Sequence, residues 1–333
     1  MEMIALGKAD IKVSRLAMGG HEYLADGRSR GFNENRQLSL TPGHIFEGFG
    51  GERRREVIKT VYDLGINFFD VTQDSEKEAL GRNLRDNPPP YPVFIQTRPE
   101  RMSYGYDKFN VRMADLGLLR EEVQRILKLM HIERLDFLNI PPLKWAFDND
   151  PEYLDKVGAN IAALKKEGLI GYAAADTFSG AEIYRKMIES DHFDVIYINF
   201  NFGDHTPGEG IIPLAKKKGL GVIAREAFMK GDLFKMAKEA EMAETGPLAA
   251  AAIRWMFTCS DVDTVFYGTG KANHLLAVAK ALEVPFGPAD AALLDSIRKT
   301  EMFKKYESRR TEEFAGRIER MDLLFVPDHL RTY

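Results

Sequence analysis

Apolar and polar positions along the chain follow one repeating order, in which a short apolar run is followed by a longer amphipathic stretch. The amphipathic stretches carry apolar residues three or four positions apart, as at Val57, Val61 and Leu64, and this spacing predicts helices. The short runs are too apolar for a sheet with one face in water. They favour parallel strands covered by helices.

The pattern predicts eight strand-and-helix units preceded by a short hairpin at 4–6 and 11–13. The predicted strands cover 15–20, 66–70, 92–97, 135–140, 170–175, 195–199, 221–224 and 264–267. Eight such units in 333 residues predict one closed (β/α)8 TIM barrel and a single domain over residues 1–333. A doubly wound open sheet is the alternative, but no Gly-x-Gly-x-x-Gly motif opens the first unit.

A long polar segment follows the first predicted strand, from His21 to Gly51, and it is rich in Gly, Asn and Arg. A segment of this length without clear periodicity, directly after a strand, is typical of a functional loop or lid. Its position decides whether Tyr23 can reach a site at the strand ends.

Composition narrows the class of protein. The chain is 44% hydrophobic and 29% charged, as in soluble globular proteins, and its formal net charge of -4 gives no reason to expect nucleic acid or an anionic membrane as partner. The single cysteine, Cys259, excludes an internal disulfide and a cysteine-rich metal site. Because the sequence shows no basic, apolar leader and no window long enough to span a bilayer, we expect a cytoplasmic protein.

The first candidate for chemistry is Asp70, which ends the apolar run Ile66-Asn-Phe-Phe-Asp70. The carboxyl ends of barrel strands meet at one mouth, where sites of this fold are built. The structural alternative is that Asp70 only caps the turn or the helix that follows.

Short motifs recur in order over most of the chain. They are Leu6 to Leu16, Gly65-Ile-Asn-Phe-Phe-Asp70, Leu80-Gly81, Arg134-Leu-Asp-Phe-Leu138, Gly168-Leu-Ile-Gly-Tyr172, Gly221-Val-Ile-Ala224 and Ala252-Ile-Arg-Trp255. In this order and spacing the chain resembles the aldo/keto reductase family from end to end. The resemblance implies a barrel whose mouth reduces a carbonyl with NADPH.

The resemblance also implies a catalytic Asp, Tyr, Lys and His, in which a cationic neighbour tunes the phenol for proton transfer. Asp70 matches the Asp. The other three places hold Ser75, Arg98 and Pro141, so the Tyr, Lys and His are absent.

The cofactor cradle implied by the resemblance is altered as well. Asp176 and Thr177 occupy the positions where the family usually has Ser-Asn, and Tyr197 occupies the position of a Gln. Arg225, which is followed by Glu226, occupies the position of the Tyr that stacks on the nicotinamide. The matching residue Asn201 and a phosphate end remain. The phosphate end is Gly268, Gly270 and Lys271 before a helix, with His274 one turn on, and its backbone N–H groups and cation suit NADP(H). The alternative is that this segment is only a turn.

Other residues could replace the missing chemistry. Arg98 suits an anion clamp better than proton transfer, because a guanidinium binds oxyanions through a fixed fork. Tyr23 or Tyr104 could supply a phenol, and His21 or His205 could act as a base. Asp70, Asp176, Glu226 and a His could hold a divalent metal, but nothing in their spacing demands one, and salt bridges with arginines are expected instead.

Three classes of function stay open. The first is a divergent nicotinamide-dependent oxidoreductase for a sugar-like or hydroxy-acid carbonyl. The second is a redox-neutral isomerase, epimerase, dehydratase or lyase that uses Asp70, Arg98, Glu226 and a His. The third is a binding or regulatory relative without catalysis. The charged mouth favours a small anionic or polyhydroxylated substrate, and the oligomeric state is not determined by the sequence.

Overall fold

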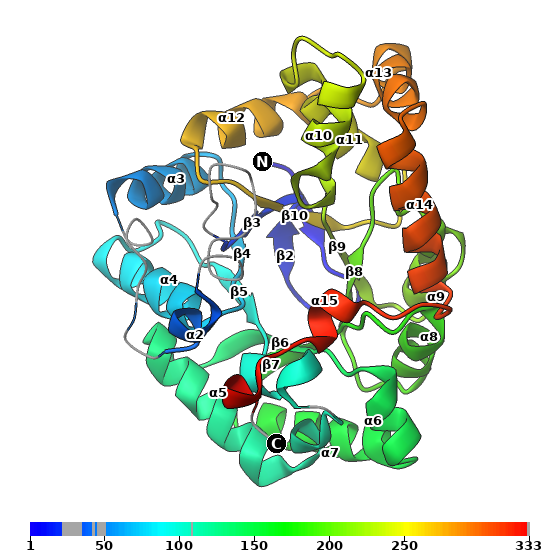
Figure 1. Ribbon diagram of the computed structural model, residues 1–333. Coiled ribbons are helices and arrows are strands. Elements are labelled where there is room, and N and C mark those ends of the chain that lie inside the picture. The colour runs from blue at the N-terminus through cyan, green and yellow to red at the C-terminus, as the bar shows by residue number, and fades with distance from the viewer. Residues whose placement is uncertain (22–34, 42–43, 45–50, 108, 332–333) are drawn as a thin grey trace.

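Eight parallel strands form a closed barrel in the computed structural model, which describes residues 1–21, 35–41, 44, 51–107 and 109–331. The order around the barrel is β10-β3-β4-β5-β6-β7-β8-β9 (Figure 1). The strands are β3 (Leu16–Gly19), β4 (Phe68–Asp70), β5 (Phe94–Thr97), β6 (Leu135–Ile140), β7 (Ile170–Ala175), β8 (Val195–Asn199), β9 (Gly221–Arg225) and β10 (Thr264–Gly268). The predicted TIM barrel is confirmed.

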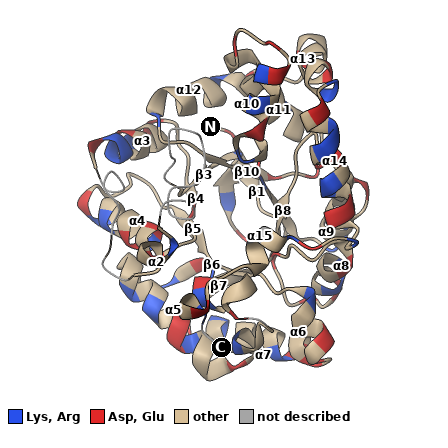
Figure 2. Cartoon of the chain, viewed as in Figure 1, with Lys and Arg blue, Asp and Glu red and all other residues tan. Residues whose placement is uncertain are grey.

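Helices form the outer layer around the strands (Figure 1). The helices that follow barrel strands are α3 (Glu52–Asp63), α4 (Asp74–Asp86), α5 (Leu116–Met130), α7 (Tyr153–Lys166), α8 (Ala181–Glu189), α9 (Ile211–Lys217), α11 (Gly246–Met256) and α12 (Ala272–Ala281). Charged residues occur mainly in these helices and in the loops, and few occur in the barrel strands (Figure 2). No helix among the described residues is long and apolar enough to cross a membrane.

Six further helices among the described residues were not predicted from the sequence. They are α2 (Arg36–Ser39), α6 (Lys144–Asn149), α10 (Asp232–Glu239), α13 (Pro288–Arg298), α14 (Glu301–Phe314) and α15 (Met321–Leu324). The first and last of these matter for the site, because both lie in segments that reach the barrel mouth. Much of the predicted 21–51 loop, with Tyr23, lies outside the described residues.

The N-terminal hairpin supplies the floor of the barrel. Its strands β1 (Met3–Ala5) and β2 (Lys12–Ser14) pair antiparallel, as predicted. Leu6 and Val13 are fully buried and join the apolar cluster of the barrel interior. The turn approaches β9 so closely that a side chain at Gly7 would overlap the backbone of Leu220 and Gly221, and the φ of Gly7 is +56°. The charged side chains inside the barrel therefore lie at its opposite end, where the strands have their carboxyl ends.

Residues 315–331, which we call the C-terminal strap, cross that opposite end after α14 (Figure 1). The backbone carbonyl of Phe325 accepts a hydrogen bond from Arg36 Nη1 at 2.8 Å. Val326 is buried against Leu40 and Tyr106. The strap thereby joins the C-terminus to the segments that follow β3 and β5.

We expect Gly81→Ala to destabilise the fold, because α4 and α5 touch at this glycine. A Cβ at Gly81 would lie 2.6 Å from Cα of Met130 and closer still to its carbonyl oxygen, and backbone cannot rotate away. Overpacking of this kind costs about 1–3 kcal/mol in the free energy of unfolding, measurable by urea titration. The matched control is Gly246→Ala in α11, where no atom lies within 4 Å of the added Cβ. Equal effects of the two substitutions would contradict the tight contact.

Candidate active site

The barrel mouth gathers charged side chains from four different strand ends. Asp70 ends β4, Arg98 follows β5, Asp176 follows β7 and Arg225 ends β9. Their exposed fractions are 7%, 7%, 0% and 9%. The structure thus brings together four of the residues predicted from the sequence, and it buries them.

Asp176 and Arg225 form a bidentate ion pair inside the mouth. Arg225 Nη1 donates to Asp176 Oδ2 at 2.8 Å, and Nη2 donates to Oδ1 at 2.6 Å. Each Asp176 oxygen takes one more hydrogen bond, Oδ2 from Asn139 Nδ2 at 3.1 Å and Oδ1 from the Tyr184 hydroxyl at 3.3 Å. Burial alone would lower the pKa of Arg225, but Asp176 outweighs burial and raises it well above its ordinary value.

Aromatic rings enclose the guanidinium of Arg225. Its Cζ lies 4.2 Å from the ring centre of Tyr197 and 4.7 Å from that of Phe178. Its Nε donates to Asn199 Oδ1 at 2.5 Å. The resemblance places the nicotinamide ring beside Arg225 and Asp176. Because these two side chains are already paired with each other, this part of the cradle does not fit the ring as the residues stand.

Asp70 is held by two donors from neighbouring strands. The Tyr197 hydroxyl donates to its Oδ2 at 2.8 Å, and Gln96 Nε2 donates to its Oδ1 at 3.2 Å. Burial raises the pKa of Asp70, and Tyr197 and His21 partly offset the rise. The interior-facing contacts argue against a mere helix cap, since Asp70 faces the barrel and not the first turn of α4.

His21 and Glu76 form the second acid–base pair of the mouth. His21 Nδ1 lies 2.7 Å from Glu76 Oε1. Burial would lower the pKa of His21, but the Glu76 carboxylate, aided by Asp70, raises it above its ordinary value. Burial opposes ionisation of Glu76 too, yet His21 and the donors on Glu76 Oε2 lower its pKa to about 2. The pair therefore favours imidazolium beside carboxylate.

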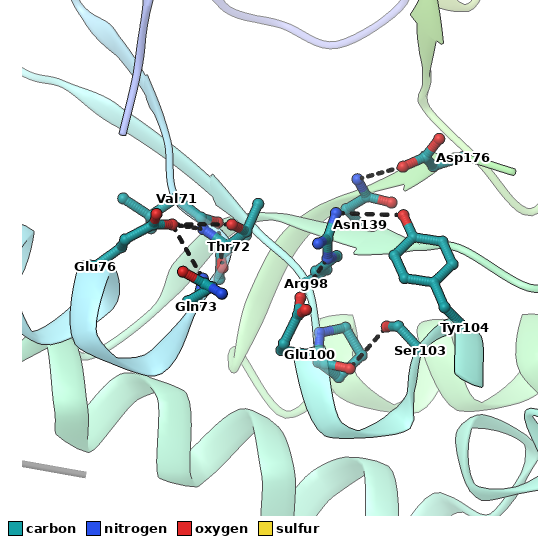
Figure 3. A network of polar contacts seen from close by, with 12 residues as sticks. Val71, Thr72, Gln73, Glu76, Arg98, Glu100, Ser103, Tyr104, Asn139 and Asp176 are labelled. Carbon is teal, nitrogen blue, oxygen red and sulfur yellow. Dashed lines mark hydrogen bonds and ion pairs between the residues drawn. The ribbon is translucent and has the colours of Figure 1, made fainter. Parts of the chain in front are cut away.

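Glu76 is fixed by the turn that leads into α4. Its Oε2 accepts from the backbone N–H groups of Thr72 and Gln73, both at 3.1 Å, and from the Thr72 hydroxyl at 2.8 Å (Figure 3). This is the capping-box position of a helix, where a carboxylate reaches back to the turn. The carboxylate that orients His21 is therefore itself rigid.

Arg98 is already paired with a buried carboxylate. Its Nε donates to Glu100 Oε2 at 2.5 Å, and its Nη1 donates to the Tyr104 hydroxyl at 3.2 Å (Figure 3). Glu100 is fully buried. Burial would lower the pKa of Arg98, and Glu100 raises it. The sequence suggested an anion clamp at Arg98, but the charge that such a clamp would use is matched by Glu100.

Glu76 and Glu100 were not predicted from the sequence. Both lie close in sequence to predicted residues, and Glu76 stands at the third position of its helix, where an acid is most simply explained as a cap. Only the folded chain shows that these two carboxylates are buried, and that each faces a cation of the mouth.

Two predicted residues lie in a neighbouring cluster with α14. Asn201 Nδ2 donates to the carbonyl of Glu226 at 3.0 Å and to the Tyr306 hydroxyl at 3.2 Å, and its Oδ1 accepts from Gly203 N–H at 3.0 Å. Burial opposes ionisation of Glu226, but Lys230 and Arg310 lower its pKa to about 2. The amide of Asn201 is thus used within the protein, and Glu226 is suited to an ion pair rather than to proton transfer.

His205 and Thr177 have local roles instead of the predicted ones. His205 is 42% exposed and faces Glu209 at 3.3 Å and Glu307 at 3.6 Å. The structure does not bring it to Asp70, because the turn after β8 directs it toward α14. The Thr177 hydroxyl donates to the carbonyl of Pro142 at 2.7 Å and so fixes the neighbouring loop.

The predicted phosphate end lies at the N-terminus of α12. Gly268 ends β10, and a side chain at Gly270 would meet no atom within 4 Å. Lys271 is the N-cap of α12, and its side chain and that of His274 are exposed. Burial and the nearby Lys271 lower the pKa of His274. An open glycine, first-turn N–H groups and a cation suit a phosphate group.

The described residues contain no group of three or more His, Cys, Asp or Glu side chains arranged to hold a metal ion. Asp70, Asp176 and Glu226, the acids considered for such a site, instead engage Tyr197, Arg225 and Lys230.

Comparisons with known proteins agree on the family and the fold. A family model described as the aldo/keto reductase family matches residues 46–299. An aldo-keto reductase from Bacillus halodurans in its holo form has 17% identity and a TM-score of 0.65, over 92% of this chain and 99% of that one. A glycerol dehydrogenase from Gluconobacter oxydans has 20% identity and a TM-score of 0.64, over 89% and 94%. No curated protein matches the sequence significantly.

We expect the Asp176 and Arg225 side chains to depend on each other for stability. Asp176→Asn leaves a buried guanidinium without its carboxylate, and such a change costs about 3–5 kcal/mol in the free energy of unfolding. Combining it with Arg225→Met should cost less than the sum of the two single changes, as a double-mutant cycle would show. Glu167→Gln is the control, since its bidentate partner Arg120 is 34% exposed and an exposed pair adds little to stability. Additive effects at 176 and 225 would contradict the pairing.

We expect Glu76→Gln to flatten the pH dependence of stability. The raised pKa of His21 stabilises the fold at pH values below its ordinary 6.5, and this contribution is lost as the pH rises through the folded value. The lowered pKa of Glu76 stabilises the fold above its ordinary 4.5, and this contribution is lost as the pH falls toward about 2. Urea titrations across pH should show both arms reduced in Glu76→Gln relative to the wild type, while other carboxylates with a lowered pKa, such as Glu226, retain part of the acid arm. Glu209→Gln, which removes the carboxylate of the exposed pair with His205, should leave the profile unchanged.

Proposed function

Because the chain belongs to the aldo/keto reductase family, a family of oxidoreductases, we propose that it reduces a sugar-like or hydroxy-acid carbonyl with His21 as the proton donor. The observation that carries this proposal is the contact of 2.7 Å between His21 and Glu76 at the barrel mouth. This pair supplies a fixed cationic acid near Asp70, at a mouth where the tyrosine implied by the resemblance is absent.

The cofactor of this proposal is NADP(H), since members of the family generally use nicotinamide cofactors. Lys271, Gly270 and the first turn of α12 would hold its phosphates. When bound, the dihydronicotinamide supplies a hydride for a carbonyl carbon. The ring end has to be accommodated differently from the resemblance, because Arg225 and Asp176 fill that part of the cradle.

His21 would transfer its proton through Nε2, since Nδ1 faces Glu76. The N–H bond at Nε2 breaks and an O–H bond forms on the substrate oxygen, which leaves a neutral imidazole. Glu76 sets the orientation of the ring, and its negative charge stabilises the protonated form before transfer. His21 keeps 29% of its side-chain surface exposed, so it is more open to an entering substrate than Asp70 or Arg98.

The charge balance of the mouth favours a polyhydroxylated substrate over an anionic one. Arg98 is matched by Glu100 and Arg225 by Asp176. Gln96 Oε1 and Asn139 Oδ1 are buried acceptors that have no hydrogen-bond partner among the described residues. Hydroxyl groups can donate to such oxygens, whereas a carboxylate cannot.

The C-terminal strap restricts entry to the mouth. Arg320 lies 4.8 Å above the ring of Phe178, and the carbonyl of Leu324 closely approaches Gly105. The cavity beside Phe178 and Arg320 has a volume of about 20 Å³, which is near the space of one water molecule. A carbonyl substrate that binds beside Phe178 would therefore have to displace the strap.

A redox-neutral proton-transfer enzyme, such as an isomerase, epimerase, dehydratase or lyase, is the second candidate. The occupied position at Arg225 and Asp176 favours it, because a redox-neutral reaction needs no hydride donor bound there. A cytoplasmic location is proposed for either function because a single cysteine fits a reducing compartment.

We expect NADPH to bind with a dependence on Lys271, measured by fluorescence titration. Loss of one cationic phosphate contact in Lys271→Ala should weaken binding by about 10- to 100-fold. Lys280→Ala, at the other end of α12, is the matched control and should bind NADPH as the wild type does.

His21→Gln should still bind NADPH, but its kcat on a panel of hydroxy-aldehydes should fall by about 10²- to 10⁴-fold. No binding at millimolar NADPH would contradict the proposal and support the redox-neutral candidate.

A further inference from the structure

Tyr104 has a backbone conformation that a residue with a large side chain rarely adopts. It lies in the short 3-10 turn η2 (Tyr104–Tyr106) after β5, with a φ of +54°. The left-handed region brings Cβ of a non-glycine residue too close to the backbone, so surrounding contacts must impose it. Strain of this kind is often retained where a side chain has to be held in one place.

The contacts that impose this conformation surround the turn. Asn110 Nδ2 donates to the carbonyl of Tyr104 at 3.3 Å and to that of Asp107 at 2.7 Å. The Ser103 hydroxyl donates to the carbonyl of Pro99 at 2.8 Å (Figure 3). On the other side, Gly105 touches the carbonyl of Leu324 in the C-terminal strap. The turn is therefore fixed from both directions.

The result is that the phenol of Tyr104 points into the mouth and meets Arg98 (Figure 3). Arg98 Nη1 donates to the Tyr104 hydroxyl oxygen at 3.2 Å, and its Cζ lies 4.8 Å from the ring centre. Phe178 packs on the ring with centres 5.4 Å apart. Only 3% of Tyr104 is exposed, so its hydrogen bonds are made in a medium of low dielectric.

The hydroxyl of Tyr104 is left as a hydrogen-bond donor. Its oxygen accepts from Arg98, which directs its own O–H away from the guanidinium. Burial raises the pKa of Tyr104, and Arg98 offsets part of this rise, so the phenol keeps its proton at neutral pH. The cation polarises the O–H bond, which makes it a stronger donor.

We propose that Tyr104 donates a hydrogen bond to the carbonyl oxygen of the substrate and, with Arg98 behind it, stabilises the negative charge that develops on that oxygen. The proton of Tyr104 stays on Tyr104, and the proton that ends on the substrate oxygen comes from His21 Nε2. No bond to Tyr104 forms or breaks. This inference rests on the proposed carbonyl chemistry and adds a residue that binds the reacting atom.

The chain offers a matched control in the same turn. Tyr106 is 2% exposed. It packs against Leu40 and against Val326 of the strap rather than against Arg98. Removing its hydroxyl changes the same chemical group at nearly the same depth. Tyr106→Phe therefore reports any general effect of losing a buried phenol from η2.

The test compares Tyr104→Phe and Tyr106→Phe in reduction of D-glyceraldehyde by NADPH. Loss of one donor to a developing oxyanion should lower kcat by about 10²- to 10³-fold in Tyr104→Phe, with the pH profile still following His21. Tyr106→Phe should keep kcat within about twofold of the wild type. Thermal melting of both variants checks that each is folded. Equal kcat values in the two variants would overturn the inference while leaving the proposed function intact.

Binding of lactamide, an unreactive amide with a carbonyl acceptor, provides a readout without turnover. Saturation-transfer NMR should show at least about tenfold weaker binding to Tyr104→Phe than to the wild type or to Tyr106→Phe. If this difference is found but no carbonyl is reduced, the donor role stands and the proposed oxidoreductase activity fails. If the wild type does not bind lactamide, or if all three proteins bind it equally, the donor role is wrong.

Discussion

The structure of the mouth depends on one constraint, which is that charge buried at the mouth of the barrel must be paired. Asp176 with Arg225, Glu100 with Arg98, and Glu76 with His21 each satisfy it at distances of 2.5 to 2.8 Å. A buried pair adds little net stability, but removing one partner leaves a charge without water or counterion. Each side chain of these pairs is consequently held in position by its partner of opposite charge.

Fixed pairs give this mouth a chemistry that family membership alone does not specify. The barrel agrees with the aldo/keto reductase family, but function lies in the side chains that a fold carries. At this mouth the cation of His21 is oriented by Glu76 and the phenol of Tyr104 by Arg98. The proposed proton donor and the proposed neutral donor thus lie in segments that the resemblance does not point to.

The C-terminal strap connects the site to the end of the chain. It touches the turn that holds Tyr104, through Leu324 and Val326, and it places Arg320 above Phe178. Tyr104 and Val326 are buried at these contacts, and burial strengthens the electrostatic interactions of nearby groups. The same contacts limit the access of a substrate to the mouth. The conformation of the strap and the geometry of the site are therefore physically coupled.

The sequence by itself determined the architecture, because buried parallel strands leave a local signal. Strands β6, β7 and β8 have the bounds that their apolar runs predicted, and the ends of successive strands correctly placed Asp70, Arg98, Asp176 and Arg225 at one mouth. Helices α13 and α14 and the strap were missed, as were Glu76 and Glu100. Asn201, Glu226 and His205 were grouped with the site but engage other partners. Only the tertiary structure decided which charges pair at the mouth. The pairing depends on distances between loops and helices that are far apart in sequence, and no local pattern encodes those distances.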